Sequence, residues 1–84
     1  MKQTTLQKIT KIQKLLYINQ IPSYIKHYKA FDIITTRDFH IRIINEKYNR
    51  TTNYKYGFMD LYDNLKWSFD DFRLLMSYIK KIIQ

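Results

Sequence analysis

Lys8, Lys11 and Lys14 recur at every third position near the start of the chain. A row of ammonium groups attracts a polyanion and releases its counterions on contact, so the chemistry available here is phosphate binding. The same row is also typical of a plain solvated helix face. No glutamate is interspersed among the lysines, and this favours phosphate binding, because ordinary surface helices mix both signs of charge.

The lysine row belongs to a longer stretch without carboxylates. The first 31 residues hold six lysines and His27 but no Asp or Glu, and all seven acidic residues lie from Asp32 onward. Residues 60–84, by contrast, carry four basic and four acidic side chains. Such a polarised distribution gives the electric field of the molecule a direction and predicts an anionic partner.

A second basic group comes from the middle of the chain. Arg42 and Lys55 fall on the outer side of two predicted strands, with Arg50 in the loop between them. Basic and aromatic side chains on a sheet can hold single-stranded nucleic acid, but the alternation directs the aromatic residues of these strands into the core. The candidate nucleic-acid-binding residues are Lys8, Lys11, Lys14, Lys26, Lys29, Arg42, Arg50 and Lys55.

Residue types that support catalysis or metal binding are sparse. His27 and His40 have no serine, cysteine or carboxylate at a spacing that recommends acid–base chemistry. The acidic residues between Asp60 and Asp71 do not match a calcium loop, and the chain has no cysteine. A single glycine, Gly57, argues against nucleotide-binding loops that need several. We therefore expect no enzymatic activity, no catalytic residue, no metal and no cofactor.

The elements that position these residues begin with a helix over about residues 5–18. The spacing Thr4-x-x-Gln7 suits a capping box, and apolar residues from Leu6 to Tyr17 recur at helical spacing. Lys8, Lys11 and Lys14 are expected on the opposite, solvated side. Pro22 ends this element, and residues 23–30 fit either a short helix, with Tyr24 and Tyr28 on one face, or the approach to a strand.

Residues 31–59 carry strand patterns. Residues 31–36 are rich in β-branched side chains, and residues 39–43 and 54–58 alternate between apolar and polar. A polar, turn-prone run from Asn45 to Asn53 separates the last two, so a three-stranded antiparallel meander is the simplest prediction. Its buried face would hold Phe39, Ile41, Ile43, Tyr54, Tyr56 and Phe58. Its outer face would hold His40, Arg42, Asn53 and Lys55.

The last segment predicts a C-terminal helix. Ser68 resembles a cap followed by Asp70 and Asp71, and apolar residues recur at helical spacing up to Ile83. Residues 60–66 fit a short preceding helix. The whole chain, residues 1–84, is expected to form a single α+β domain with an N-terminal helix, a three-stranded antiparallel meander and a C-terminal helix, the helices packed on one sheet face. No stretch is apolar enough for a membrane span, and the cytoplasm is the expected location.

These patterns predict a small, non-enzymatic basic protein that contacts the backbone of DNA or RNA with weak sequence specificity. The alternative is a phage or mobile-element inhibitor or adaptor that binds a host nuclease or defence complex, an anti-CRISPR-type role. A tyrosine-rich composition typical of an A/T-rich gene favours this alternative. A weaker third hypothesis places residues 5–18 on an anionic membrane surface. The expected partner is nucleic acid or an acidic protein surface, and the apolar content allows a homo-oligomer.

Overall fold

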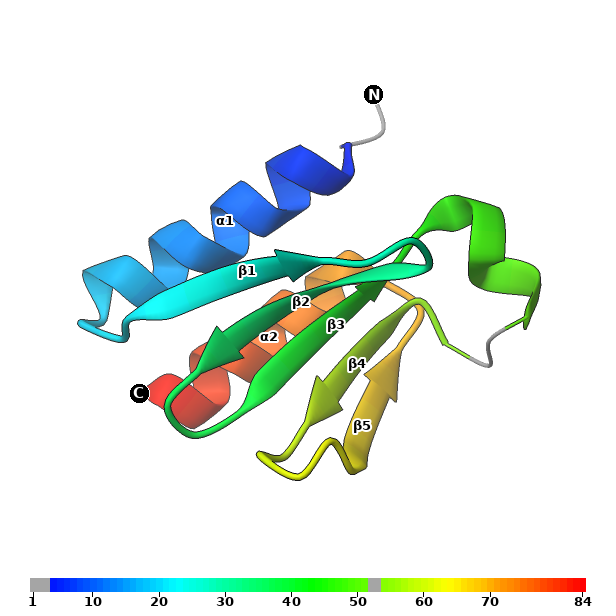
Figure 1. Ribbon diagram of the computed structural model, residues 1–84. Helices are drawn as coiled ribbons and strands as arrows, with labels where there is room; N and C mark the ends of the chain where they lie inside the picture. The colour runs from blue at the N-terminus through cyan, green and yellow to red at the C-terminus, as the bar shows by residue number, and fades with distance from the viewer. Residues whose placement is uncertain (1–3, 52–53) are drawn as a thin grey trace.

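The computed structural model describes residues 4–51 and 54–84, without the side chains of residues 49–51. These residues form two layers, an antiparallel sheet and two helices that cover one face of it (Figure 1). The predicted α+β class is confirmed. The elements in chain order are α1 (Thr5–Ile18), β1 (Ser23–His27), β2 (Phe31–Thr36), β3 (His40–Ile44), the 3₁₀ helix η1 (Glu46–Thr51), β4 (Tyr56–Met59), β5 (Leu65–Phe69) and α2 (Phe72–Ile83).

Helix α1 begins and ends where the sequence predicts. The Thr4 hydroxyl accepts a hydrogen bond from the Gln7 N–H at 3.1 Å, and the Thr4 N–H donates to Gln7 Oε1 at 2.8 Å. This reciprocal pair satisfies two backbone donors that a helix start leaves free. The helix ends at Ile18 with Asn19 as its C-cap, and Gln20 adopts a positive φ of 62° two residues before Pro22. The capping box and the proline therefore set both ends of α1.

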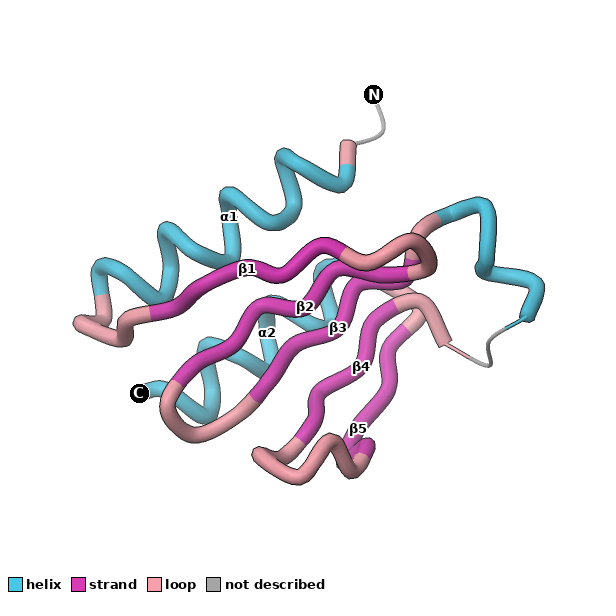
Figure 2. Tube along the Cα trace, in the orientation of Figure 1, coloured by secondary structure: helices cyan, strands magenta, loops and turns pink. Residues whose placement is uncertain are grey.

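The sheet is a meander in which each strand pairs antiparallel with the next, from β1 to β5 (Figure 2). Residues that pair across antiparallel strands share a face, so Ile25, Ile34, Ile41 and Phe58 form one row beneath the helices. Side chains from both layers close the core: Ile9, Ile12, Leu16, Ile34, Phe39, Ile41, Ile43, Tyr56, Phe58, Leu75 and Ile79. Five of the six residues predicted for the buried face are among them, and Tyr54 is the exception.

The sheet has five strands, so the prediction of three is wrong. Residues 23–27 form a strand of their own, β1, so this segment is neither a short helix nor only the approach to a strand. β1 pairs with β2 along its whole length, from Ser23 opposite Thr36 to His27 opposite Asp32. Its half-buried residues Ser23 and Ile25 alternate with exposed ones, as in any strand with one covered face.

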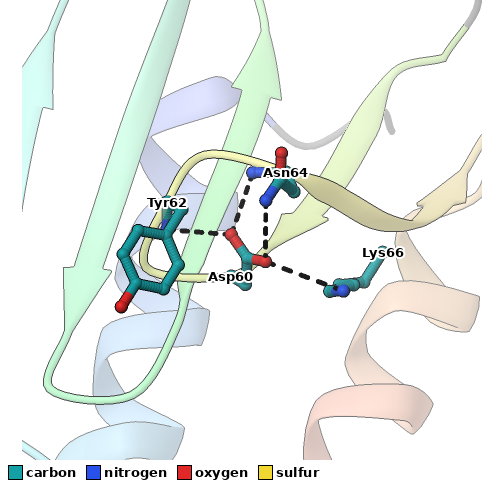
Figure 3. A network of polar contacts seen from close by, with 4 residues as sticks. All are labelled: Asp60, Tyr62, Asn64 and Lys66. Carbon is teal, nitrogen blue, oxygen red and sulfur yellow. Dashed lines mark hydrogen bonds and ion pairs between the residues drawn. The ribbon is translucent and has the colours of Figure 1, made fainter.

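A turn and the start of the fifth strand replace the short helix predicted over residues 60–66. The Asp60 carboxylate accepts hydrogen bonds from the N–H groups of Tyr62 and Asn64, at 2.8 and 2.9 Å, and so closes a turn (Figure 3). Asp63 adopts a positive φ of 63° in this turn. Aspartate tolerates this left-handed conformation better than most residues, which suits it to a turn. The chain then returns as β5 along β4.

Helix α2 begins later than the sequence predicts. Its cap is Asp71, whose Oδ1 accepts the Arg73 N–H at 2.9 Å, and not Ser68, which lies in β5 opposite Gly57. The extension of the sheet by β5 takes up the residues between 65 and 69, so a helix can start only after them. Lys80 and Lys81 occupy the last turn of α2, where cations are favoured.

Candidate nucleic-acid interface

The face of the sheet that the helices leave uncovered is set by the strand register. Pairing places twelve strand residues on it: Tyr24, Lys26, Phe31, Ile33, Thr35, His40, Arg42, Ile44, Gly57, Met59, Leu65 and Ser68. We call this surface the open face. None of these twelve residues is acidic, while Lys26 and Arg42 are basic and lie in one cross-strand row on either side of Ile33.

Arg42 lies on the open face, as predicted, and its guanidinium is held by two aromatic residues. The guanidinium carbon lies 4.4 Å from the ring centroid of Phe31, and Nη1 donates a hydrogen bond to the Tyr54 hydroxyl at 3.3 Å. A guanidinium over a ring face gains a cation–π attraction. Within the described residues, the buried Arg42 Nε has no hydrogen-bond partner. The two aromatic contacts thus fix the position of the charge.

Tyr54 lies on the open face, which corrects the prediction that it belongs to the core. A Cβ atom at Gly57 would meet Tyr54 Cε2 at 2.8 Å, closer than real Cβ contacts, so the Tyr54 ring lies directly against the glycine. The alternation fails here because the backbone bends at Lys55 and β4 begins only at Tyr56. The sequence signal for this contact is the lone glycine in an otherwise bulky strand.

The lysine row does not lie on a single solvated side of α1. Lys8 is half-buried, and its Nζ donates to the Tyr56 hydroxyl at 2.6 Å and lies 5.3 Å from the Tyr56 ring centroid. The prediction that Lys8 faces solvent is therefore wrong, whereas Lys11 and Lys14 are exposed. A step of three residues falls about 60° short of a full helical turn, so such a row winds around the helix.

The other basic residues predicted to bind nucleic acid do not lie together. Lys26 is exposed on β1, and Lys29 is exposed in the turn between β1 and β2. Lys55 is exposed in the bend before β4, and after the dominant hydrogen bond from the Arg73 N–H its charge adds a smaller contribution to lowering the pKa of Asp71. The Arg50 side chain and Asn53 lie outside the described part of the chain.

Both histidines and the carboxylates of Asp32 and Asp60 have structural partners. His27 Nδ1 lies 2.8 Å from Asp32 Oδ1, and His40 Nδ1 lies 3.0 Å from the Thr35 hydroxyl. The hydrogen bond from the Asn64 N–H is the largest cause that lowers the pKa of Asp60, the turn residue. Within residues 4–51 and 54–84, no three His, Cys, Asp or Glu residues lie close enough together to hold a metal ion.

Two basic groups of residues remain, and one residue of the second group, Lys26, lies at the edge of the molecule where the first group lies. Lys11 and Lys14 lie on α1, whereas Lys26 and Arg42 lie on the open face, on the other side of the sheet from the helices. Helix α1 runs along β1, and the Gln13 side chain donates to the Ser23 hydroxyl of β1 at 3.5 Å (Figure 1). The edge formed by α1 and β1 therefore carries cations on both of its sides.

Comparison of the chain with protein-family models, with curated protein sequences and with solved structures finds no match. No helix in the described part of the chain has the length and apolar character needed to cross a membrane.

Proposed function

We propose that this protein is a small, non-enzymatic nucleic-acid-binding protein that contacts the sugar–phosphate backbone with weak sequence specificity. One observation carries the proposal. The part of the chain without carboxylates folds into α1, β1 and the turn after β1, which lie side by side (Figure 2). The segment that has lysines and no carboxylates therefore lies along one edge of the folded molecule. The uneven distribution of charge in the sequence is thus also uneven across the structure.

The electrostatics of this edge favour a polyanion. Lys11, Lys14, Lys26 and Lys29 are exposed, and the segment that carries them supplies no carboxylate to neutralise them. Phosphates that pair with such cations release bound counterions, which makes binding favourable and sensitive to salt. Weak sequence specificity follows from lysine itself, since it acts as a point charge and carries no base-reading geometry. Arg42 adds a fixed guanidinium on the open face.

The absence of catalytic activity is part of the same proposal. Catalysis requires titratable groups that converge in a pocket. Among the described residues, His27 and His40 pair with Asp32 and Thr35 in different places on β1, β2 and β3, and Asp60 and Asp71 serve as turn and cap. These contacts account for each group without a reaction.

Fluorescence anisotropy with a labelled oligonucleotide tests the proposal. We expect binding at about 50 mM salt that weakens steeply by about 200 mM. The double variants K11Q/K14Q and K26Q/K29Q should each lower the affinity severalfold and reduce the salt slope by about two. The matched control K66Q/R73Q removes two charges from β5 and α2, away from the α1–β1 edge, and should change the affinity less than twofold. Equal losses in all three variants would overturn the proposal.

A second function, binding to a host protein as an inhibitor or adaptor, is favoured by one apolar surface. Tyr17 and Ile18 are 80% and 65% exposed at the end of α1, where Ile21 and Pro22 adjoin them. Exposed aromatic and aliphatic groups in contact with one another are typical of protein interfaces. This function predicts a complex that survives nuclease treatment and is lost in a Y17S/I18S variant. A nuclease-sensitive complex would exclude it.

A further inference from the structure

The edge strand β1 carries an alternating aromatic and cationic surface. Tyr24 and Lys26 lie on the open face, and Tyr28, two residues further on, continues the same side of the ladder because its N–H donates to the Phe31 carbonyl at 2.9 Å. All three side chains are exposed, with Tyr24 and Tyr28 at 67% and 51%. We call this surface the Tyr–Lys–Tyr edge.

One end of the Tyr–Lys–Tyr edge packs against a neighbouring aromatic ring. The ring centroids of Tyr28 and Phe31 are 5.1 Å apart, and the Arg42 guanidinium lies on the Phe31 ring. Alternate residues of a strand are about 7 Å apart, so the Cα atom of Lys26 lies midway between the Cα atoms of Tyr24 and Tyr28. The strand thus carries an exposed tyrosine at each end of a short line, with an exposed lysine between them.

From this arrangement we propose that the Tyr–Lys–Tyr edge binds one unpaired strand of nucleic acid. Bases stack on Tyr24 and Tyr28, and an intervening phosphate pairs with Lys26. The inference rests on the proposed function and deepens it by naming the form of nucleic acid. A duplex hides its base faces and can offer this edge only phosphates, whereas an unpaired strand offers both groups at once.

Charge complementarity supports this occupant. The twelve described residues of the open face include no carboxylate, and Lys26 and Arg42 lie two strands apart in one row, about 10 Å from each other. A polyanion that binds across β1 therefore contacts Lys26 first and Arg42 further along. Base faces and phosphates are common to RNA and DNA, so the edge should not distinguish the two sugars.

Anisotropy titrations with three probes test the inference: an unstructured 12-nucleotide DNA, RNA of the same sequence, and the corresponding DNA duplex. We expect Tyr24→Ala and Tyr28→Ala each to weaken binding to the unpaired strands about 5- to 100-fold. Binding to the duplex should change less than twofold. Tyr24→Phe keeps the ring and should keep the affinity. Tyr62→Ala is the matched control, because Tyr62 is 86% exposed in the turn before β5, at the other edge of the sheet.

The possible outcomes separate this inference from the proposed function. Salt-dependent binding that is equal for duplex and unpaired strands, or unchanged in Y24A/Y28A, overturns the Tyr–Lys–Tyr edge and leaves backbone binding standing. No binding to any probe overturns both. A tenfold or greater preference for RNA over DNA contradicts recognition by rings and phosphates alone. Thermal unfolding of each variant shows that it is folded before its affinity is compared.

Discussion

Aromatic rings decide what two of the cationic side chains can do. Lys8 donates to the Tyr56 hydroxyl and lies within 6 Å of the Tyr56 and Phe72 ring centroids, so its charge serves the contact between α1, β4 and α2. Arg42 is held on the open face by Phe31 and Tyr54. The sequence alone identifies both Lys8 and Arg42 as basic residues that could bind an anion. Only the contacts show that Lys8 is used internally, because no local pattern announces a partner 48 residues away.

Gly57 is the residue on which the placement of Tyr54 depends. Replacing it with alanine puts a methyl group 2.8 Å from Tyr54 Cε2 and 3.1 Å from Leu65 Cδ1. Because the φ of Gly57 is not positive, the backbone accepts alanine and the penalty is steric. We expect Gly57→Ala to lower the free energy of unfolding by about 1–3 kcal/mol, measured by chemical denaturation.

A double-mutant cycle with Tyr54→Ala isolates the cause. Removal of the ring leaves room for the new methyl group, so Gly57→Ala should be nearly neutral in the Tyr54→Ala background. If the penalty at Gly57 were unchanged in that background, Tyr54 would not be the neighbour that requires a glycine.

At the scale of elements, a helix or strand can be predicted from the sequence where short-range signals mark its ends. Helix α1 could be predicted because its capping box and proline are short-range features. β1 could not be decided from sequence, because Tyr24 and Tyr28 share a face in a helix and in a strand alike. The sequence does not predict β5, although Leu65, Trp67 and Phe69 alternate with polar residues. Ser68 beside Asp70 and Asp71 resembles a helix cap instead. The pairing of β5 with β4 overrides that signal.

The turn between β4 and β5 predicts a pH dependence of stability. The hydrogen bond from the Asn64 N–H, helped by those from Tyr62 and the Asn64 amide, lowers the pKa of Asp60 below its ordinary value. The unfolded chain then binds a proton more readily than the folded protein, so this contribution is complete above about pH 4 and is lost as pH falls further. Asp60→Asn should flatten the fall in unfolding free energy as the pH drops below about 4. A slope identical to that of the unchanged protein would contradict this role.

At the scale of the whole molecule, the sheet separates two basic surfaces that the sequence could not place. Lys11 and Lys14 lie with the helices, whereas Lys26 and Arg42 lie on the open face, and only the α1–β1 edge joins them. Half of the predicted binding residues thus stay available in one region: Lys11, Lys14, Lys26 and Lys29. These four lysines share a region because α1 packs along β1. The spacing of the lysines in the sequence does not predict this contact between two elements.

This arrangement predicts the footprint of a bound strand. On titration of ¹⁵N-labelled protein with the unstructured 12-nucleotide DNA, amide signals of β1, the β1–β2 turn and α1 should shift first, while those of β5 and α2 should move little. Ligand that binds only the folded state also stabilises it, by about 2.7 kcal/mol at a concentration 100 times Kd. The Y24A/Y28A variant should lose most of this stabilisation by the unpaired strand and retain the weaker effect of the duplex. Shifts centred on β5 and Trp67 would place the binding surface at the opposite edge and contradict the α1–β1 assignment.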